Sequence, residues 1–179
     1  MSIKQEAAFH EAGHAVAAFR SRFHNIVGTI SLEQYGAGEI FVSLSKRKLR
    51  AAGLPVDESS EAIKEVAVDL AVVLCAGLVA ERLAAERIVT LRANPACAEP
   101  DHTLLRNQLS KAGLSRHFDR HEETARNLLS LEWPLLNSLA SYLYSKVTVE
   151  PTDVIAFLEQ ASNAALTQVA PHETPPGEG

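Results

Sequence analysis

Hydrophobic positions recur at helical spacing along most of the chain and predict a mainly helical fold. Residues 3–23 are rich in alanine, contain no proline and predict a first helix. Residues 59–88 predict a long central helix, because the middle of this segment is apolar over most of its circumference. The same pattern predicts three further helices: residues 101–113, residues 121–146 with a kink at Pro134, and a short helix that begins near Thr152 or Asp153.

Two short β-branched and apolar runs interrupt the helical pattern, at residues 25–32 and 38–44. The glycine-containing connection "EQYGAG" between them predicts a β-hairpin. The polar stretch 45–60 is expected to be a loop. We therefore expect one mainly α domain over residues 1–165 with one small hairpin, and a disordered tail, rich in proline and glycine, over residues 166–179.

Composition narrows the class of protein. With 179 residues, 46% hydrophobic residues and 22% charged residues, the chain fits one globular domain. The net charge is −5 and the densest basic cluster, residues 46–50, is short, so nucleic acid is an unexpected partner. The most apolar segment, residues 70–80, falls short of the ~20 residues that span a bilayer. Two cysteines, Cys75 in an apolar run and Cys97 in a loop, together with an N-terminus that lacks a signal sequence, favour the cytoplasm.

The candidate chemistry lies in the first helix, in the sequence His-Glu-Ala-Gly-His at residues 10–14. Positions four apart lie on one face of a helix, so His10 and His14 can bind one metal ion from successive turns. Glu11 lies about 100° further round and can accept a proton from a water molecule at the metal. Such a division of roles is typical of H-E-x-x-H zinc peptidases. Most neighbouring residues are small or apolar, and a bound Zn²⁺ would satisfy two imidazoles that are otherwise costly to bury.

Four segments resemble, in order, the protease domain of the FtsH-type zinc metalloproteases. The resemblance covers roughly residues 4 to 160 and implies a helical zinc-metallopeptidase domain with a small β-element next to the active-site helix. The matching segments are "HEAGHAVAAF" for the zinc helix, "IVGTISLEQYGAGEIFVSL" for the β-element, "CAGLVAERL" for a Gly-Gly-x-x-Ala-Glu helix segment and "NLLSLEWPLLNSLASYLYSKVTVEPTDVIAFL" for the closing helices.

The resemblance also implies a third zinc ligand, an aspartate on a later helix, and Asp101 fits that place. Glu99, His102 and Glu81 stay open as candidates for the same role. A carboxylate is also expected to hold the second nitrogen of a ligand histidine, and Glu81 or Asp69 in the central helix can do so. The remaining histidines lie in polar surroundings and are expected at the surface: His24, His117, His121 and His172.

The leading expectation is a zinc endopeptidase that works without ATP, because the sequence has no G-x-x-x-x-G-K-[ST] phosphate loop. Its expected substrates are peptides or unstructured protein segments. The strand at residues 38–44 is expected to offer an edge on which an extended substrate forms main-chain hydrogen bonds. The alternative function is a catalytically silent module that keeps the protease fold and binds a partner protein. Glu11 favours catalysis, since a module that only binds has little need of a base beside the zinc.

Overall fold

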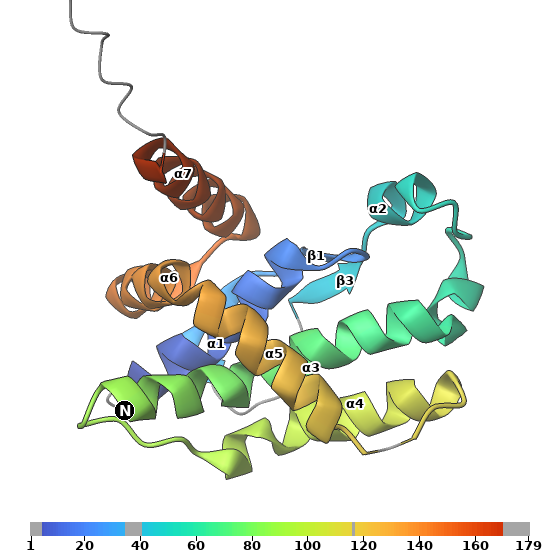
Figure 1. The fold of residues 1–179 in the computed structure, drawn as a ribbon, viewed down its shortest axis with the longest axis horizontal. Helices are drawn as coiled ribbons and strands as arrows, with labels where there is room; N and C mark the ends of the chain where they lie inside the picture. Colours follow the sequence, from blue (N-terminus) through green and yellow to red (C-terminus); the bar gives the residue numbers. More distant parts are fainter. Residues whose placement is uncertain (1–4, 35–40, 116, 170–179) are drawn as a thin grey trace, which may run out of the picture.

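A computed structural model describes residues 5–34, 41–115 and 117–169. Its described part is mainly helical, as the sequence predicts (Figure 1). The helices are α1 (Gln5–Arg20), α2 (Lys46–Ala51), α3 (Lys64–Arg87), α4 (Glu99–Lys111), α5 (Asp119–Leu131), α6 (Trp133–Lys146) and α7 (Pro151–Val169), with 3-10 turns η1 (Leu32–Gln34), η2 (Glu58–Ala62) and η3 (Pro95–Ala98). The strands are β1 (His24–Ile26), β2 (Ile30–Ser31), β3 (Val42–Leu44) and β4 (Thr148–Val149).

The core forms where α1 packs against α3, with α4 and α5 also against α3 and α6 against α1 (Figure 1). The interface between α1 and α3 is lined by small side chains, and Gly13 lies at its closest point. A Cβ atom at Gly13 would lie 2.6 Å from Ala80 Cβ and closer still to the carbonyl oxygen of Ala76. A glycine inside a helix costs about 1 kcal/mol relative to alanine. Here the close contact between the backbones of α1 and α3 explains why position 13 is a glycine.

The β-structure differs from the predicted single hairpin. β1 and β3 do pair as antiparallel strands, with Ile26 opposite Val42, but β2 pairs with β4 in a second two-stranded sheet. The predicted run 25–32 is divided at a β-bulge, where the backbone N–H groups of Val27 and Gly28 both donate to the carbonyl of Phe41 (2.7 and 3.1 Å). A bulge bends its strand, and here the chain turns away from β3.

Two predictions about the helices are wrong, and the last helix is longer than expected. Residues 121–146 form two helices, α5 and α6, because Pro134 lies in the first turn of a new helix, where its missing N–H is tolerated. The predicted loop 45–60 contains α2, whose first turn is capped by Ser45 Oγ. The last helix begins at Pro151, close to the predicted start, and continues to Val169, past the predicted boundary at residue 165. Residues 170–179, including His172, lie outside the described residues.

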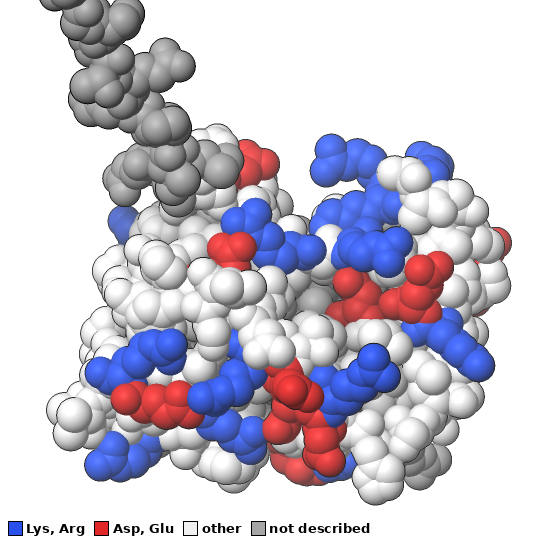
Figure 2. All heavy atoms as spheres, in the orientation of Figure 1, with Lys and Arg blue, Asp and Glu red and all other residues white. Residues whose placement is uncertain are grey.

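The basic residues at positions 46–50 lie on helix α2, and most of them are exposed to solvent. Figure 2 shows Lys and Arg side chains gathered over α2, and Lys46, Arg47 and Arg50 are exposed. Lys48 instead turns toward the end of α1, where its Nζ donates to the carbonyls of Ser21 (2.8 Å) and His24 (2.5 Å). The exposed cations therefore lie on the outer surface of the short helix.

Two other predictions concern the cysteines and the membrane. Cys75 and Cys97 are both free; Cys75 is buried as predicted, and burial raises the pKa of its thiol to about 12. Such a thiol is inert as a nucleophile at neutral pH. Within the described residues, none of the helices combines the length and the hydropathy that crossing a bilayer requires.

Candidate metal centre

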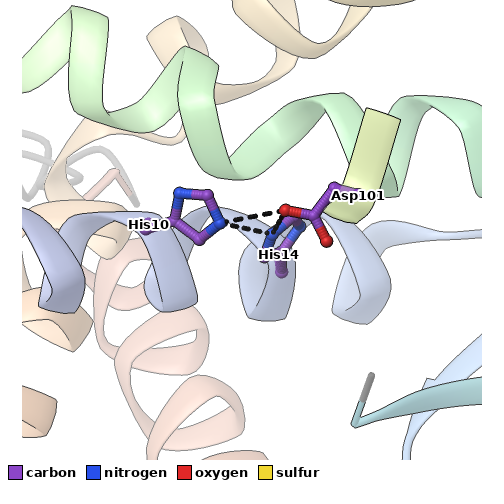
Figure 3. Close-up of side chains that lie close together, drawn as sticks. All are labelled: His10, His14 and Asp101. Carbon is purple, nitrogen blue, oxygen red and sulfur yellow. Dashed lines mark hydrogen bonds and ion pairs between the residues drawn. The ribbon is translucent and has the colours of Figure 1, made fainter. Parts of the chain in front are cut away.

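His10, His14 and Asp101, the three residues expected to bind the metal ion, lie close together in the core (Figure 3). The two histidines come from successive turns of α1, and Asp101 comes from the first turn of α4. His10 Nε2 lies 3.1 Å from His14 Nε2 and 3.1 Å from Asp101 Oδ2, and His14 Nε2 lies 3.4 Å from Asp101 Oδ2. His10 and Asp101 are 91 residues apart in the sequence, so the fold brings the three potential ligand atoms together.

The spacing of these atoms fits a tetrahedral metal ion. A Zn²⁺ ion about 2.0–2.1 Å from each ligand atom separates neighbouring ligand atoms by about 3.3 Å. The observed separations of 3.1, 3.1 and 3.4 Å need adjustments of only a few tenths of an ångström. Two imidazole nitrogens and one carboxylate oxygen are donors that zinc accepts, with a fourth position left for solvent or substrate. The residues present therefore fit the predicted ion.

The outer nitrogens of both histidines are held by acceptors. His10 Nδ1 donates to Glu81 Oε1 (2.6 Å), and His14 Nδ1 donates to the carbonyl of Val73 (2.8 Å). Glu81 is in turn fixed through Oε2, which accepts the backbone N–H of Asn94 (2.7 Å). These bonds hold a proton on each Nδ1, so each Nε2 can offer its lone pair to a metal ion once it has lost its own proton. The role predicted for Glu81 is thus consistent with its position, and it is not a third ligand.

The backbone of α3 closes one side of the site at Gly77. A Cβ atom there would lie 2.7 Å from His10 Nε2, 2.8 Å from His10 Cε1 and closer still to His14 Nε2. Any side chain at this position would take the space beside the two ligand nitrogens. Sequence reasoning did not assign a role to Gly77. The signal available was a glycine in the middle of a buried helix, a position that normally costs stability.

The electrostatics of the site favour a cation. Burial alone would lower the pKa of His10, but hydrogen bonds to Asp101 and Glu81 outweigh burial and raise it to about 10. Burial alone would raise the pKa of Asp101, but the two imidazoles outweigh it and hold this pKa well below its usual range. The pKa of Glu11 is raised by burial, and the charges of His14 and His10 oppose that shift only in part. Glu11 is thereby a stronger base than an exposed carboxylate.

Asp69 and His24 form a separate structural cluster, which corrects the prediction for His24 and leaves Glu81 as the carboxylate beside His10. His24 is 2% exposed instead of lying at the surface, and its Nδ1 donates to Asp69 Oδ2 (2.7 Å). Asp69 also accepts the hydroxyl of Ser21 and the backbone N–H of Arg22 (3.1 Å). Asp69 therefore fixes the turn after α1 and holds neither of the two ligand histidines.

Neither Glu99 nor His102 takes the place of the third ligand. Glu99 is exposed and pairs with Arg106 (3.0 Å). His102 is buried against Phe118, with ring centroids 4.7 Å apart, and its Nε2 has no hydrogen-bond partner among the described residues. Asp101 is the carboxylate that lies against both His10 and His14.

Two further histidines were expected at the surface. His117 is exposed as predicted, whereas His121 is half-buried. Burial lowers the pKa of His121, and the charge of Arg120 lowers it further. Neither histidine belongs to the cluster of potential ligands.

Comparisons of this chain with protein-family models, with curated proteins and with solved structures find no match in any of the three. The function is therefore argued from the chemistry of the site.

Proposed function

We propose that this protein is a zinc-dependent metallopeptidase that hydrolyses peptide bonds in peptides or unstructured protein segments without ATP. The observation that carries the proposal is the convergence of His10, His14 and Asp101 at separations of 3.1 to 3.4 Å, with Glu11 next to the first ligand on the same helix. The resemblance to FtsH-type protease domains agrees with it and stays a prediction.

Each residue of the site has a role in the proposed reaction. His10, His14 and Asp101 would hold the ion, which when bound supplies an acidified water molecule and polarises the scissile carbonyl. Glu11 would accept the proton of the attacking water and return it to the leaving amine; burial raises its pKa, which makes it a stronger base than an exposed carboxylate. Glu81 keeps His10 in the tautomer and orientation that ligation needs.

The proposed substrate path follows β3. One edge of this strand pairs with β1, and the ring of Phe41, just before the strand, lies 6.3 Å from the ring of His14. An extended peptide can hydrogen-bond to the other edge of β3 and pass the metal centre with little dependence on its sequence. The predicted strand spans residues 38–44; its residues 38–40 lie outside the described part of the chain.

Digestion of a peptide library by the zinc-loaded protein tests this function. We expect cleavage by the wild type and a loss of at least about 100-fold in Glu11→Gln, which removes the base but keeps the size of the side chain. Glu123→Gln, the same change at an exposed position on α5, is the matched control and should cleave normally. Cleavage that survives Glu11→Gln refutes the mechanism. A protein that binds zinc and cleaves nothing belongs instead to the second class, a module that docks a partner.

A further inference from the structure

Three exposed cations on α2 form a positively charged surface (Figure 2). Lys46, Arg47 and Arg50 are exposed on this short helix, within five positions of one another. Within the described residues, the lysine and arginine side chains that form ion pairs with acidic residues lie elsewhere: Arg20, Arg22, Arg82, Arg106, Lys111 and Arg126. The three cations of α2 are therefore available to an anionic ligand.

The stability of α2 does not explain these cations. Positive charge in the first turn of a helix opposes the helix dipole, and α2 has no acidic residue there. Lys46 and Arg50 are four positions apart, where like charges repel one another. The helix is held instead by its N-cap Ser45 and by Leu49, which is buried in a small apolar cluster. Residues that oppose the stability of their own helix are expected at functional sites.

The free edge of β3 leads directly to α2. The carbonyl of Phe41 accepts the N–H of Val27 (2.7 Å), and the N–H of Ser45 donates to the residue before β1 (2.8 Å). Bonded residues alternate along an antiparallel strand, so Val42 and Leu44 direct their N–H and C=O groups to the opposite edge. No strand among the described residues pairs with that edge. A peptide that extends along it reaches α2 after Leu44.

Two contacts place α2 about 10 to 16 Å from the potential metal ligands. The ring of Phe41 lies 6.3 Å from the ring of His14, and Lys46 follows Phe41 by five residues, which span about 16 Å when extended. Lys48 Nζ donates to the carbonyl of Ser21 (2.8 Å), and Ser21 follows His14 by seven residues, or about 10 Å at the rise of a helix. At about 3.3 Å per residue, a peptide therefore meets the cations of α2 roughly three to five residues from the cleaved bond.

We propose that Lys46, Arg47 and Arg50 bind acidic side chains of a peptide substrate, on the side of the cleaved bond that lies toward α2. The inference rests on the proposed peptidase function and names its substrate class, peptides with an acidic segment. Hydrogen bonding along β3 is indifferent to side chains, so the cations supply a preference that the strand lacks. A nucleic acid would also meet the cations, but it has no peptide groups to pair with the free edge of β3.

Binding to the full-length, zinc-loaded Glu11→Gln variant tests this site, because the variant lacks the base proposed for cleavage. The probes are three fluorescent peptides that share one apolar core and carry a block of glutamates, glutamines or lysines, made with the block at either end. With the block at one of the two ends, we expect fluorescence anisotropy in 50 mM salt to show the glutamate peptide binding about tenfold tighter than the glutamine peptide, since three exposed ion pairs multiply a small effect each. The lysine peptide should bind weakest. In 1 M salt, where the screening length falls to about 3 Å, the three peptides should bind alike.

A pair of double variants locates the effect. Lys46→Gln combined with Arg47→Gln should reduce the glutamate preference to about twofold or less, because one cation of the three remains. Arg120→Gln combined with Lys146→Gln is the matched control: it removes the same two charges from exposed positions on α5 and α6 and should preserve the preference.

Several results would overturn the site. Equal binding of the three peptides in 50 mM salt, a glutamate preference that survives the change at Lys46 and Arg47, or tighter binding of a twelve-nucleotide oligothymidylate each contradict it. The first and third need no substitution in α2, so they decide the matter even if the double variant fails to fold. A glutamate preference in a protein whose wild type cleaves no peptide refutes the peptidase and keeps the site for acidic segments. Cleavage by the wild type together with equal binding of the three peptides refutes the site alone.

Discussion

Replacing Gly77 by alanine tests whether the space beside the His10 and His14 imidazoles holds a metal ion. In a helix interior, glycine to alanine normally stabilises by about 1 kcal/mol where the new Cβ atom meets no other group. The new Cβ atom, however, would lie 2.7 Å from His10 Nε2, whereas ordinary van der Waals contact begins at 3.4 Å. The imidazole must move by about 0.7 Å. Ligand distances in metal sites tolerate only about ±0.2 Å, so we expect Gly77→Ala to lose zinc affinity by at least about 100-fold.

The assay is competitive zinc titration with a chromogenic chelator, combined with urea unfolding of the metal-free protein. We expect Gly77→Ala to keep the fold, because imidazole rings can rotate away, and to lose the ion. Gly13→Ala is the contrasting variant: its Cβ would meet the backbone of α3 at Ala76, so it should lower the free energy of unfolding by roughly 1–3 kcal/mol. Wild-type zinc affinity in Gly77→Ala would refute the placement of the ion between α1 and α3.

Three further predictions follow from the same contacts. In urea unfolding, the metal-free protein should lose stability as the pH rises from about 6.5 to about 10, because His10 stabilises the fold through its raised pKa only while its ring is protonated. Zinc affinity should rise over the same pH range, since the ion binds the neutral ring. Glu81→Gln should weaken zinc binding by about 10–100-fold in the chelator titration, since a neutral amide polarises the bonded imidazole less than a carboxylate does. Asp69→Asn should lower the free energy of unfolding by roughly 1–3 kcal/mol through its bonds to His24 and Ser21, while the zinc content measured by mass spectrometry stays at the wild-type level.

The part of the site that obeys local geometry could be predicted from the sequence. His10 and His14 share a helix, so their spacing alone places both imidazoles on the same face. Asp101 was reached through a family resemblance and not through spacing, because no local rule connects positions 91 residues apart. The competing carboxylates could be separated from it only by the fold, which places Glu99 at the surface and Glu81 on the outer nitrogen of His10.

The error at His24 has a simple cause: a histidine in a polar stretch of sequence is expected at the surface. His24 and Asp69 satisfy each other in a half-buried cluster, and the pairing depends on how the turn after α1 meets α3. The predicted hairpin is confirmed only for the pairing of β1 with β3; the bulge at Val27 and Gly28 and the pairing of β2 with β4 depend on contacts distant in sequence. Pairing between distant segments is a tertiary property, and hydrophobic periodicity carries no information about it.

Gly13 and Gly77 together limit the directions from which a substrate can reach the proposed metal centre. Gly13 lets α3 come into near contact with α1, and Gly77 keeps that approach free of side chains at the ligand nitrogens. The imidazoles are thus bounded by their own helix, by α3 and by Asp101 at the start of α4. The further neighbour of His14 is the ring of Phe41, which leads into β3. A peptide bound for the proposed metal centre is therefore expected along β3.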